Sequence, residues 1–122
     1  MEPLAIIAYK KLLPGSQLLN RLQDLRYRVH ATHDLDGLLK LAANEGPMLI
    51  LLDLDFEGLD TCAVVASLRA DERTRHIPVI AFASDDQESL METARKSGAT
   101  MVAGTSGLAT HLPQLLEQAL AN

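Results

Sequence analysis

Three acidic residues, Asp53, Asp55 and Glu57, follow a short apolar run and are well placed to do chemistry. The run, Met48 to Leu52, is apolar at every position, which is typical of a central strand buried on both faces. Ligands of open α/β sheets bind beyond the carboxyl ends of the strands, so Asp53 lies where a reaction would occur. Carboxylate oxygens also bind Mg²⁺, which makes Asp53 and Asp55 weak candidate metal ligands. No further ligand is identifiable, and acids near a helix N-terminus also complement the helix dipole.

The amino-acid composition excludes several classes of protein. The 122 residues include 11 Lys and Arg against 16 Asp and Glu, and the formal net charge of −5 argues against nucleic acid as a partner. We find no apolar stretch of membrane-spanning length and no signal-peptide pattern. The single cysteine, Cys62, cannot form an internal disulfide, which is typical of the reducing cytoplasm. We therefore expect one cytoplasmic domain over residues 1–122, without an output domain in the same chain.

Predicted strands and helices alternate along the chain. Short apolar or alternating runs predict strands over Leu4–Ala8, Tyr27–Thr32, Met48–Leu52, Ile77–Phe82 and Thr100–Ala103. Leucine spacing and capping residues predict helices from Ser16 to Arg26, from Leu35 to the Gly46-Pro47 stop, from Asp60 to Ala70, from Ser84–Asp86 to Ser97, and from His111 to Ala121. Pro14-Gly15-Ser16 is expected to be a turn and Thr105-Ser106-Gly107 a loop. This alternation predicts an α/β fold with a parallel sheet between two layers of helices.

The stretch LLDLDFEGLDTCAVVASLRADERTRHIPVIAFAS resembles the middle of a two-component response regulator receiver domain. That family shows LLDLxxPGxDG, a helix ending in LRxD, and then IPVIxLTA. Tyr27-Arg28-Val29 and Gly98-Ala99 match the family near its second and fifth strands, so the resemblance covers the whole chain. It implies a flavodoxin-like (βα)5 three-layer sandwich with a parallel five-stranded sheet of order 2-1-3-4-5. It also aligns Asp53 with the aspartate that accepts the phosphoryl group.

The other groups of a working receiver site are missing at the matching positions. An acidic pair after the first strand holds Mg²⁺ in the family, whereas Tyr9 and Lys10 stand there in this chain. The family's Thr or Ser after the fourth strand falls on Ala83, and Ser84, one residue later, is expected to point elsewhere. The family's lysine falls on Thr105. The resemblance therefore implies a degenerate receiver, or pseudo-receiver, that is not an enzyme and uses no cofactor, Mg²⁺ included.

The function that we infer from the sequence is a phosphorylation-independent module of a two-component system or phosphorelay that binds protein partners. Asp53 is then a structural residue whose carboxylate pairs with Lys10 or Lys11. In the family, partners and second copies bind the fourth helix, fifth strand and fifth helix. These elements correspond here to about Asp86–Ser97, Thr100–Ala103 and His111–Ala121.

Two alternative functions remain open from the sequence. The first is a working single-domain response regulator that is phosphorylated on Asp53. The second, from another class, is a small-molecule or nucleotide binder on a flavodoxin-like scaffold. The segment Tyr9-Lys10-Lys11 argues against the second, because a glycine-rich loop would be expected there.

Overall fold

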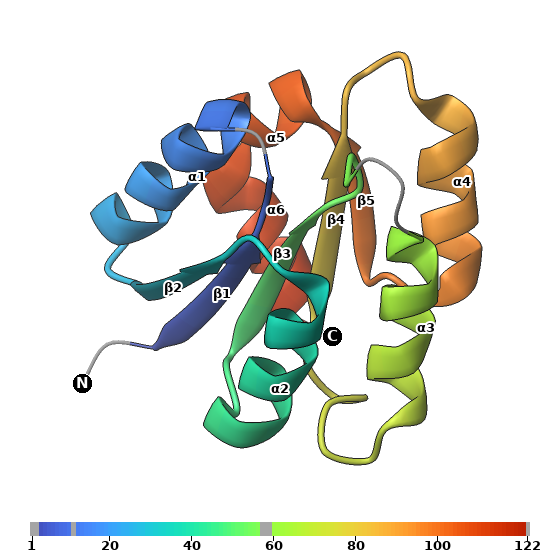
Figure 1. The fold of residues 1–122 in the computed structure, drawn as a ribbon. Coiled ribbons are helices and arrows are strands. Elements are labelled where there is room, and N and C mark those ends of the chain that lie inside the picture. Colours follow the sequence, from blue (N-terminus) through green and yellow to red (C-terminus); the bar gives the residue numbers. More distant parts are fainter. Residues whose placement is uncertain (1–2, 11, 57–59, 122) are drawn as a thin grey trace.

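Residues 3–10, 12–56 and 60–121 are described by the computed structural model. Five parallel strands form one sheet in the order β2-β1-β3-β4-β5, which confirms the predicted order (Figure 1). The strands are β1 Leu4–Ala8, β2 Arg28–Thr32, β3 Leu49–Asp53, β4 Val79–Ala83 and β5 Met101–Gly104. The helices are α1 Leu12–Asp24, α2 Leu35–Glu45, α3 Thr61–Ala70, α4 Glu88–Ser97, α5 Thr105–Thr110 and α6 Leu112–Leu120. None of these helices is long and apolar enough to cross a lipid bilayer.

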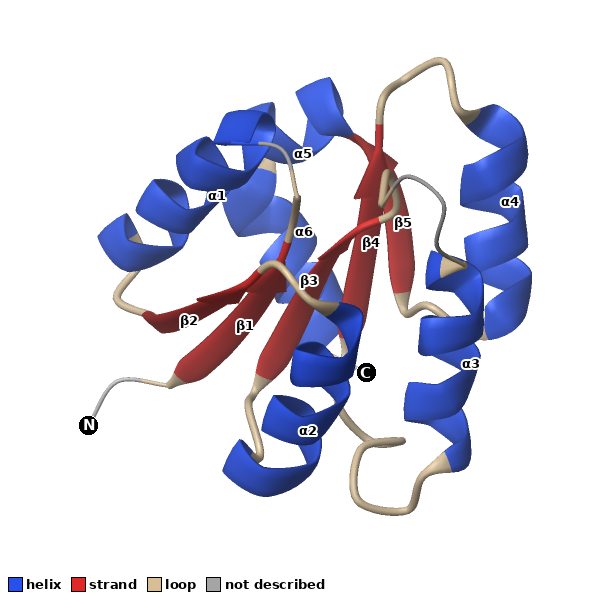
Figure 2. Cartoon of the chain, viewed as in Figure 1, coloured by secondary structure: helices blue, strands red, loops and turns tan. Residues whose placement is uncertain are grey.

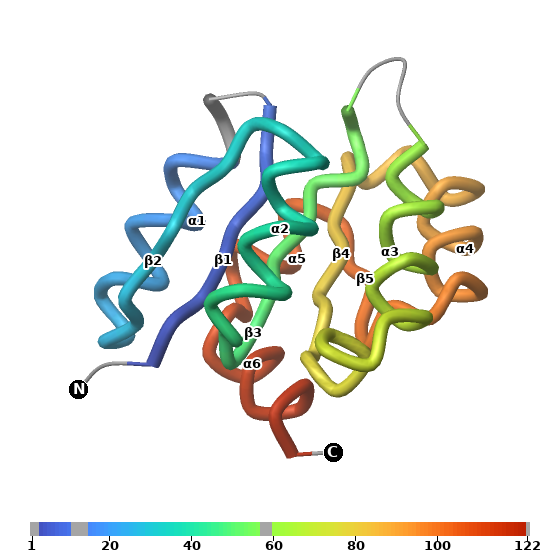
Figure 3. The backbone as a smooth tube through the Cα atoms, turned by 60° about the horizontal axis from the view of Figure 1, so that its bottom comes forward, coloured from blue at the N-terminus to red at the C-terminus, as the bar shows by residue number. Residues whose placement is uncertain are grey.

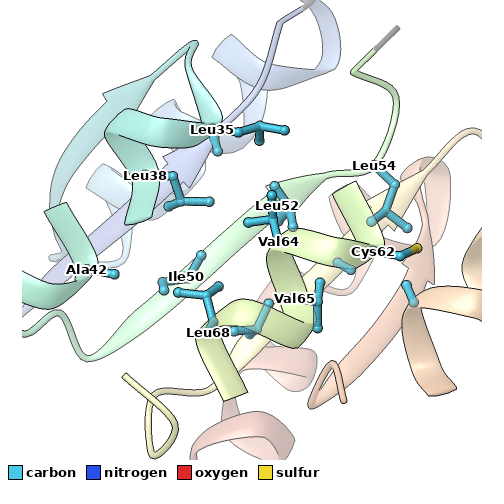
Figure 4. Close-up of a cluster of buried hydrophobic side chains, with 14 of the residues drawn as sticks. Leu35, Leu38, Ala42, Ile50, Leu52, Leu54, Cys62, Val64, Val65 and Leu68 are labelled. Atoms are coloured by element: carbon cyan, nitrogen blue, oxygen red, sulfur yellow. The ribbon is translucent and has the colours of Figure 1, made fainter. Parts of the chain in front are cut away.

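Helices cover both faces of the sheet, so the predicted three-layer sandwich is confirmed (Figure 2). The helices α1, α5 and α6 pack on one face, and α2, α3 and α4 pack on the other. The central strands β3 and β4 are buried at every position, because their apolar sequences contact both layers. Figure 4 shows one side of this core, where Leu38 of α2 and Leu68 of α3 lie over β3. The edge strand β2 has no buried residue, as its alternating sequence predicts.

The predicted turn at Pro14-Gly15-Ser16 is wrong. Helix α1 already begins at Leu12, so these three residues lie inside its first turns. Proline is tolerated there because the first N–H groups of a helix have no acceptor within the helix. Turn-forming residue types and helix-starting residue types overlap, and the sequence pattern does not separate them at this position.

Two further boundaries differ from the prediction at the carboxyl edge of the sheet. Helix α4 starts at Glu88 rather than within Ser84–Asp86, because the Ser84 and Asp85 side chains bond to other loops. The predicted loop Thr105–Gly107 is the first half of the short helix α5. The break between α5 and α6 falls at His111, because Pro113 has no N–H to continue the helical bonding.

Arg69 connects α3 to the opposite edge of the sheet, where β4 and β5 begin. Its Nε donates to the carbonyl of Gly98 at 2.7 Å, and its Nη1 donates to the carbonyls of Arg75 and Ile77 at 2.7 and 2.9 Å. Its Nη2 donates to Thr100 Oγ1 at 2.7 Å. Partial burial lowers the pKa of Arg69 below its ordinary value. One side chain thus satisfies groups from two connecting segments, the α3–β4 loop and the α4–β5 loop.

Candidate functional site

The carboxyl ends of neighbouring strands meet at one edge of the sheet, as Figure 3 shows for β1, β3 and β4. The pairs in register at this edge are Ala8 with Leu52, Asp53 with Phe82, and Ala83 with Gly104. Because the strands are parallel, residues that follow these pairs share the same edge. The structure therefore gathers the predicted site positions, which are Asp53, Tyr9, Lys10, Ala83 and Thr105.

Asp53 is the last residue of β3 and is only 2% exposed. Its Oδ1 accepts a hydrogen bond from the backbone N–H of Asp55 at 2.8 Å, so the carboxylate orders the loop that leaves the strand. The Asp55 carboxylate is half-buried, and its Oδ2 accepts from Ser84 Oγ at 3.3 Å and from the Ser84 N–H at 3.4 Å. Each carboxylate is thus already bonded to a neighbouring loop. Glu57, the third predicted acid, lies outside the described residues.

Tyr9 takes the position that follows β1, and its ring belongs to the hydrophobic core. The side chain is 6% exposed and lies in the same core cluster as Leu18 and Leu22 of α1. A methyl group on Gly15 would overlap the ring, so this glycine permits the close approach of α1. The His33 ring contacts Tyr9 edge-on with centroids 4.7 Å apart, and its Nδ1 donates to the Tyr9 carbonyl at 2.7 Å. A packed aromatic ring therefore stands where a carboxylate would be needed to bind a cation.

The end of β4 offers no hydroxyl from the strand itself. Ala83 is 1% exposed, and its methyl group belongs to the core on the side of α2, α3 and α4. Ser84, which is expected to point away from the phosphoryl position, bonds the Asp55 carboxylate through its hydroxyl. The strand ends at Ala83, so the alternation of strand side chains no longer applies to Ser84. At 3.3 Å this contact is longer than a strong O–H···O bond.

The start of α5 is also occupied by contacts within the chain. Thr105 Oγ1 donates to the carbonyl of Ala83 at 3.0 Å, which ties the beginning of α5 to the end of β4. Ser106 donates from its Oγ to Asp85 Oδ2 and from its N–H to Asp85 Oδ1 at 3.4 Å. Neither residue offers the cationic group that a phosphoryl anion would require.

The pairing of Asp53 with Lys10 or Lys11 stays a prediction. The Lys10 side chain is exposed, and the ion pairs among the described residues include Arg73 with Asp71 and Arg95 with Glu92. Lys11, the other predicted partner, lies outside the described residues.

The site residues do not fit Mg²⁺. This cation requires near-octahedral oxygen ligands, usually with one or two carboxylates. The Tyr9 ring closes the place of the acidic pair, while the Asp53 and Asp55 carboxylates already accept hydrogen bonds from the backbone. Within the described parts of the chain, no cluster of three or more His, Cys, Asp or Glu side chains could hold a metal ion.

The comparison with known sequences finds one kind of relative. No protein-family model matches the chain. Over 74 residues the chain is 35% identical to the response regulator PleD of Caulobacter vibrioides. The match covers 61% of this chain, but only 16% of the length of PleD.

Solved structures match over the whole chain. A protein of Chloroflexus aurantiacus that is assigned as a response regulator superposes with a TM-score of 0.91 at 16% identity, covering 100% of both chains. The receiver domain of the sensor histidine kinase PA1611 from Pseudomonas aeruginosa, solved with a magnesium ion in its active site cleft, gives 0.88 at 19% identity and the same coverage. The chain has the fold of a response regulator receiver domain. At these identities the structural likeness establishes the fold and not the state of the site.

Within this receiver fold, sequence reasoning located Asp53 but missed the contacts around it. Ser84 bonds the loop after β4 to the loop after β3, and Asp85 bonds the loop after β4 to Ser106 in α5. A signal was present in the sequence, since Asp55 comes two residues after β3, Ser84 follows β4 and Thr105 follows β5. The geometry of the loops decides which acid bonds which hydroxyl, and the sequence pattern does not predict these pairs.

A cavity of about 240 Å³ lies elsewhere, between α2 and α3 and the loop that precedes β4. Leu39, Leu68 and Thr74 are among its lining residues. It is thus separate from the carboxyl edge, where the nucleotide-binding alternative would place its ligand.

Proposed function

We propose that this receiver-fold chain is a two-component signalling module that binds protein partners without phosphorylation of Asp53. The observation that carries the proposal is the position of Tyr9, whose ring is packed into the core at the place of the metal-binding acids. Phosphoryl transfer needs positive charge around the transferring group, and metal ions and cationic side chains usually supply it. Tyr9, Ala83 and Thr105 supply none of that charge. In this proposal the module is a binding protein and not an enzyme.

The proposed partner surface consists of α4, β5 and α6, corresponding to residues 86–97, 100–103 and 111–121. Strand β5 is an edge of the sheet, and each of its four residues is half-exposed. Met101, Val102 and Leu115 are apolar and only partly covered, so a partner could bury them. Glu92 and Arg95 are exposed charged residues of α4 and would make up part of the polar rim of an interface. A homodimer through this surface is one form of the proposal.

A titration followed by amide NMR tests whether Asp53 belongs to a working phosphorylation site. Mg²⁺ is added first at millimolar concentration, and beryllofluoride, which mimics a phosphoryl group on aspartate, is added second. We expect no shifts that cluster around Asp53, because Tyr9, Ala83 and Thr105 carry neither a cationic nor a metal-binding side chain to hold the anion. Asp53→Ala serves as the control for non-specific shifts. Shifts at Asp53 and Asp55 in the wild type that are absent from this variant would contradict the proposal.

One observation favours a second candidate function, a working response regulator. Asp53 is at the end of the central strand, where the phosphoacceptor of the family lies, and Ser84 provides a hydroxyl nearby. The beryllofluoride titration separates the two candidates, because only a working site would respond to it.

A further inference from the structure

Asp85 contacts the end of β5 and the first turn of α5, which follow each other directly. It lies in the loop between β4 and α4, three residues before α4 begins at Glu88. Its two carboxylate oxygens accept hydrogen bonds from the side chain and the backbone N–H of Ser106. We call these two bonds the Asp85 bridge. The bridge spans 21 residues of sequence and connects the elements on either side of β5.

A second observation supports the bridge independently of the hydrogen bonds. Gly104, the last residue of β5, lies directly against the Asp85 carboxylate, and a methyl group on Gly104 would overlap Oδ1. The backbone of Gly104 has φ −71° and ψ 152°, an extended conformation that alanine also adopts. A side chain at this position would therefore have to displace the Asp85 carboxylate, although the backbone itself would not be strained.

The negative charge of Asp85 is suited to the first turn of α5. The N–H groups in the first turn of a helix have no acceptor within the helix, and a carboxylate oxygen satisfies one of them. Asp85 does this from a different loop, whereas the residue that precedes α5 is Gly104 and has no side chain to do so. The anion that bonds the start of α5 is therefore part of the chain itself.

We infer that Asp85 is a positioning residue that holds the start of α4 against the start of α5 without a phosphoryl group. The bridge keeps the surface of α4, β5 and α6 in a single arrangement, because β5 lies between the two elements that it joins. This inference rests on the proposed function, in which that surface binds partners and Asp53 is not phosphorylated. It adds a residue of the chain itself that joins the loop before α4 to the start of α5.

Hydrogen exchange of the Ser106 amide, measured by NMR, tests the bridge. Asp85→Ala removes the acceptor, and we expect the Ser106 amide to exchange about fivefold faster, the effect of losing one helix-capping bond. Shifts of the amides at the starts of α4 and α5 should accompany the change. Asp86→Ala is the matched control, since Asp86 is the next residue, is exposed, and forms no hydrogen bond or ion pair with the described residues. This control should leave Ser106 exchange unchanged.

Gly104→Ala gives a second, independent variant. In the wild type it should displace the Asp85 carboxylate and raise Ser106 exchange as Asp85→Ala does. In the Asp85→Ala background it should cause no further increase, because the overlapping group has already been removed. Equal effects of Gly104→Ala in both backgrounds would overturn the inference, as would Ser106 exchange that is unchanged in Asp85→Ala. Thermal unfolding of each variant verifies that the fold is retained.

The inference and the proposed function can fail separately. If acetyl phosphate labels Asp53 while the Asp85 variants behave as expected, the bridge stands and the phosphorylation-independent function is wrong. If Asp53 is not labelled and Ser106 exchange does not respond to Asp85→Ala, the bridge is wrong and the proposed function is unaffected.

Discussion

Replacing Tyr9 with alanine should destabilise the domain, because the ring is a packed part of the core. The side chain is 6% exposed and contacts α1 beside Gly15, where there is no room for a methyl group. A buried aromatic side chain removes roughly 150–250 Å² from water, worth about 4–6 kcal/mol at 25 cal/mol per Å². The unfolded chain already buries part of that area, and aromatic-to-alanine substitutions in cores cost roughly 3–5 kcal/mol. We therefore expect Tyr9→Ala to lower the free energy of unfolding by about 3 kcal/mol.

Urea unfolding followed by circular dichroism measures this loss. Tyr9→Phe is the matched control, because it keeps the ring and should cost less than about 1 kcal/mol. The slope of the unfolding free energy against urea should stay constant in both variants, which shows that the same surface is exposed on unfolding. A loss of less than about 1 kcal/mol for Tyr9→Ala, or equal losses for both variants, would refute the structural role of the ring.

Because Tyr9 is packed in the core, restoring the acidic pair should also change the stability of the domain. Tyr9→Asp with Lys10→Asp should recover Mg²⁺ binding, because it adds two carboxylates beside Asp53. It should also cost at least as much stability as Tyr9→Ala, since it removes the same ring and adds charge. Calorimetric titration with Mg²⁺ reads the first effect and urea unfolding reads the second. A double variant as stable as the wild type without Mg²⁺ would contradict the packing argument.

Two further predictions concern the rest of the domain. Arg69→Ala should lower the free energy of unfolding by about 2–4 kcal/mol, because it leaves two partly buried carbonyls without this donor, whereas Arg95→Ala, at an exposed ion pair, should cost less than about 1 kcal/mol. Equal losses in urea unfolding would show that the Arg69 bonds contribute little. Burial, and to a smaller extent the negative charge of Asp60, raises the pKa of the Cys62 thiol. Less thiolate is therefore present at neutral pH, and we expect Cys62 to react with thiol reagents more slowly than free cysteine. Asp60→Asn should make Cys62 react faster with the reagent, while the asparagine side chain still caps α3. A Cys62 that reacts as fast as free cysteine would contradict the raised pKa.

The layers of the fold follow directly from the sequence. The apolar run at Met48–Leu52 predicts a strand buried on both faces, and Leu49–Asp53 is such a strand. Gly46 ends α2 as predicted, and Asp34 and Gly98 cap α2 and α4, because side-chain capping and the left-handed backbone conformation are local properties. The start of α1 was missed, since proline and glycine are compatible with both a turn and a first helical turn.

The candidate site was only partly predictable. The position of Asp53 follows from the strand pattern and the resemblance, and the missing acids are visible as Tyr9 and Lys10. The packing of Tyr9 against Gly15 was not predictable, because it depends on how closely α1 approaches the sheet. The bonds of Asp85 likewise join loops far apart in sequence, and neither residue type nor spacing specifies such pairs.

Incubation with acetyl phosphate and Mg²⁺, followed by intact mass measurement, tests the central claim most directly. A receiver domain that retains the acidic pair is treated in parallel as the positive control. The proposed function predicts that the wild-type chain gains no phosphoryl group, because Tyr9, Ala83 and Thr105 leave the transferring group without charge compensation. A gain of one phosphoryl group that Asp53→Ala abolishes would contradict it and would establish a working receiver.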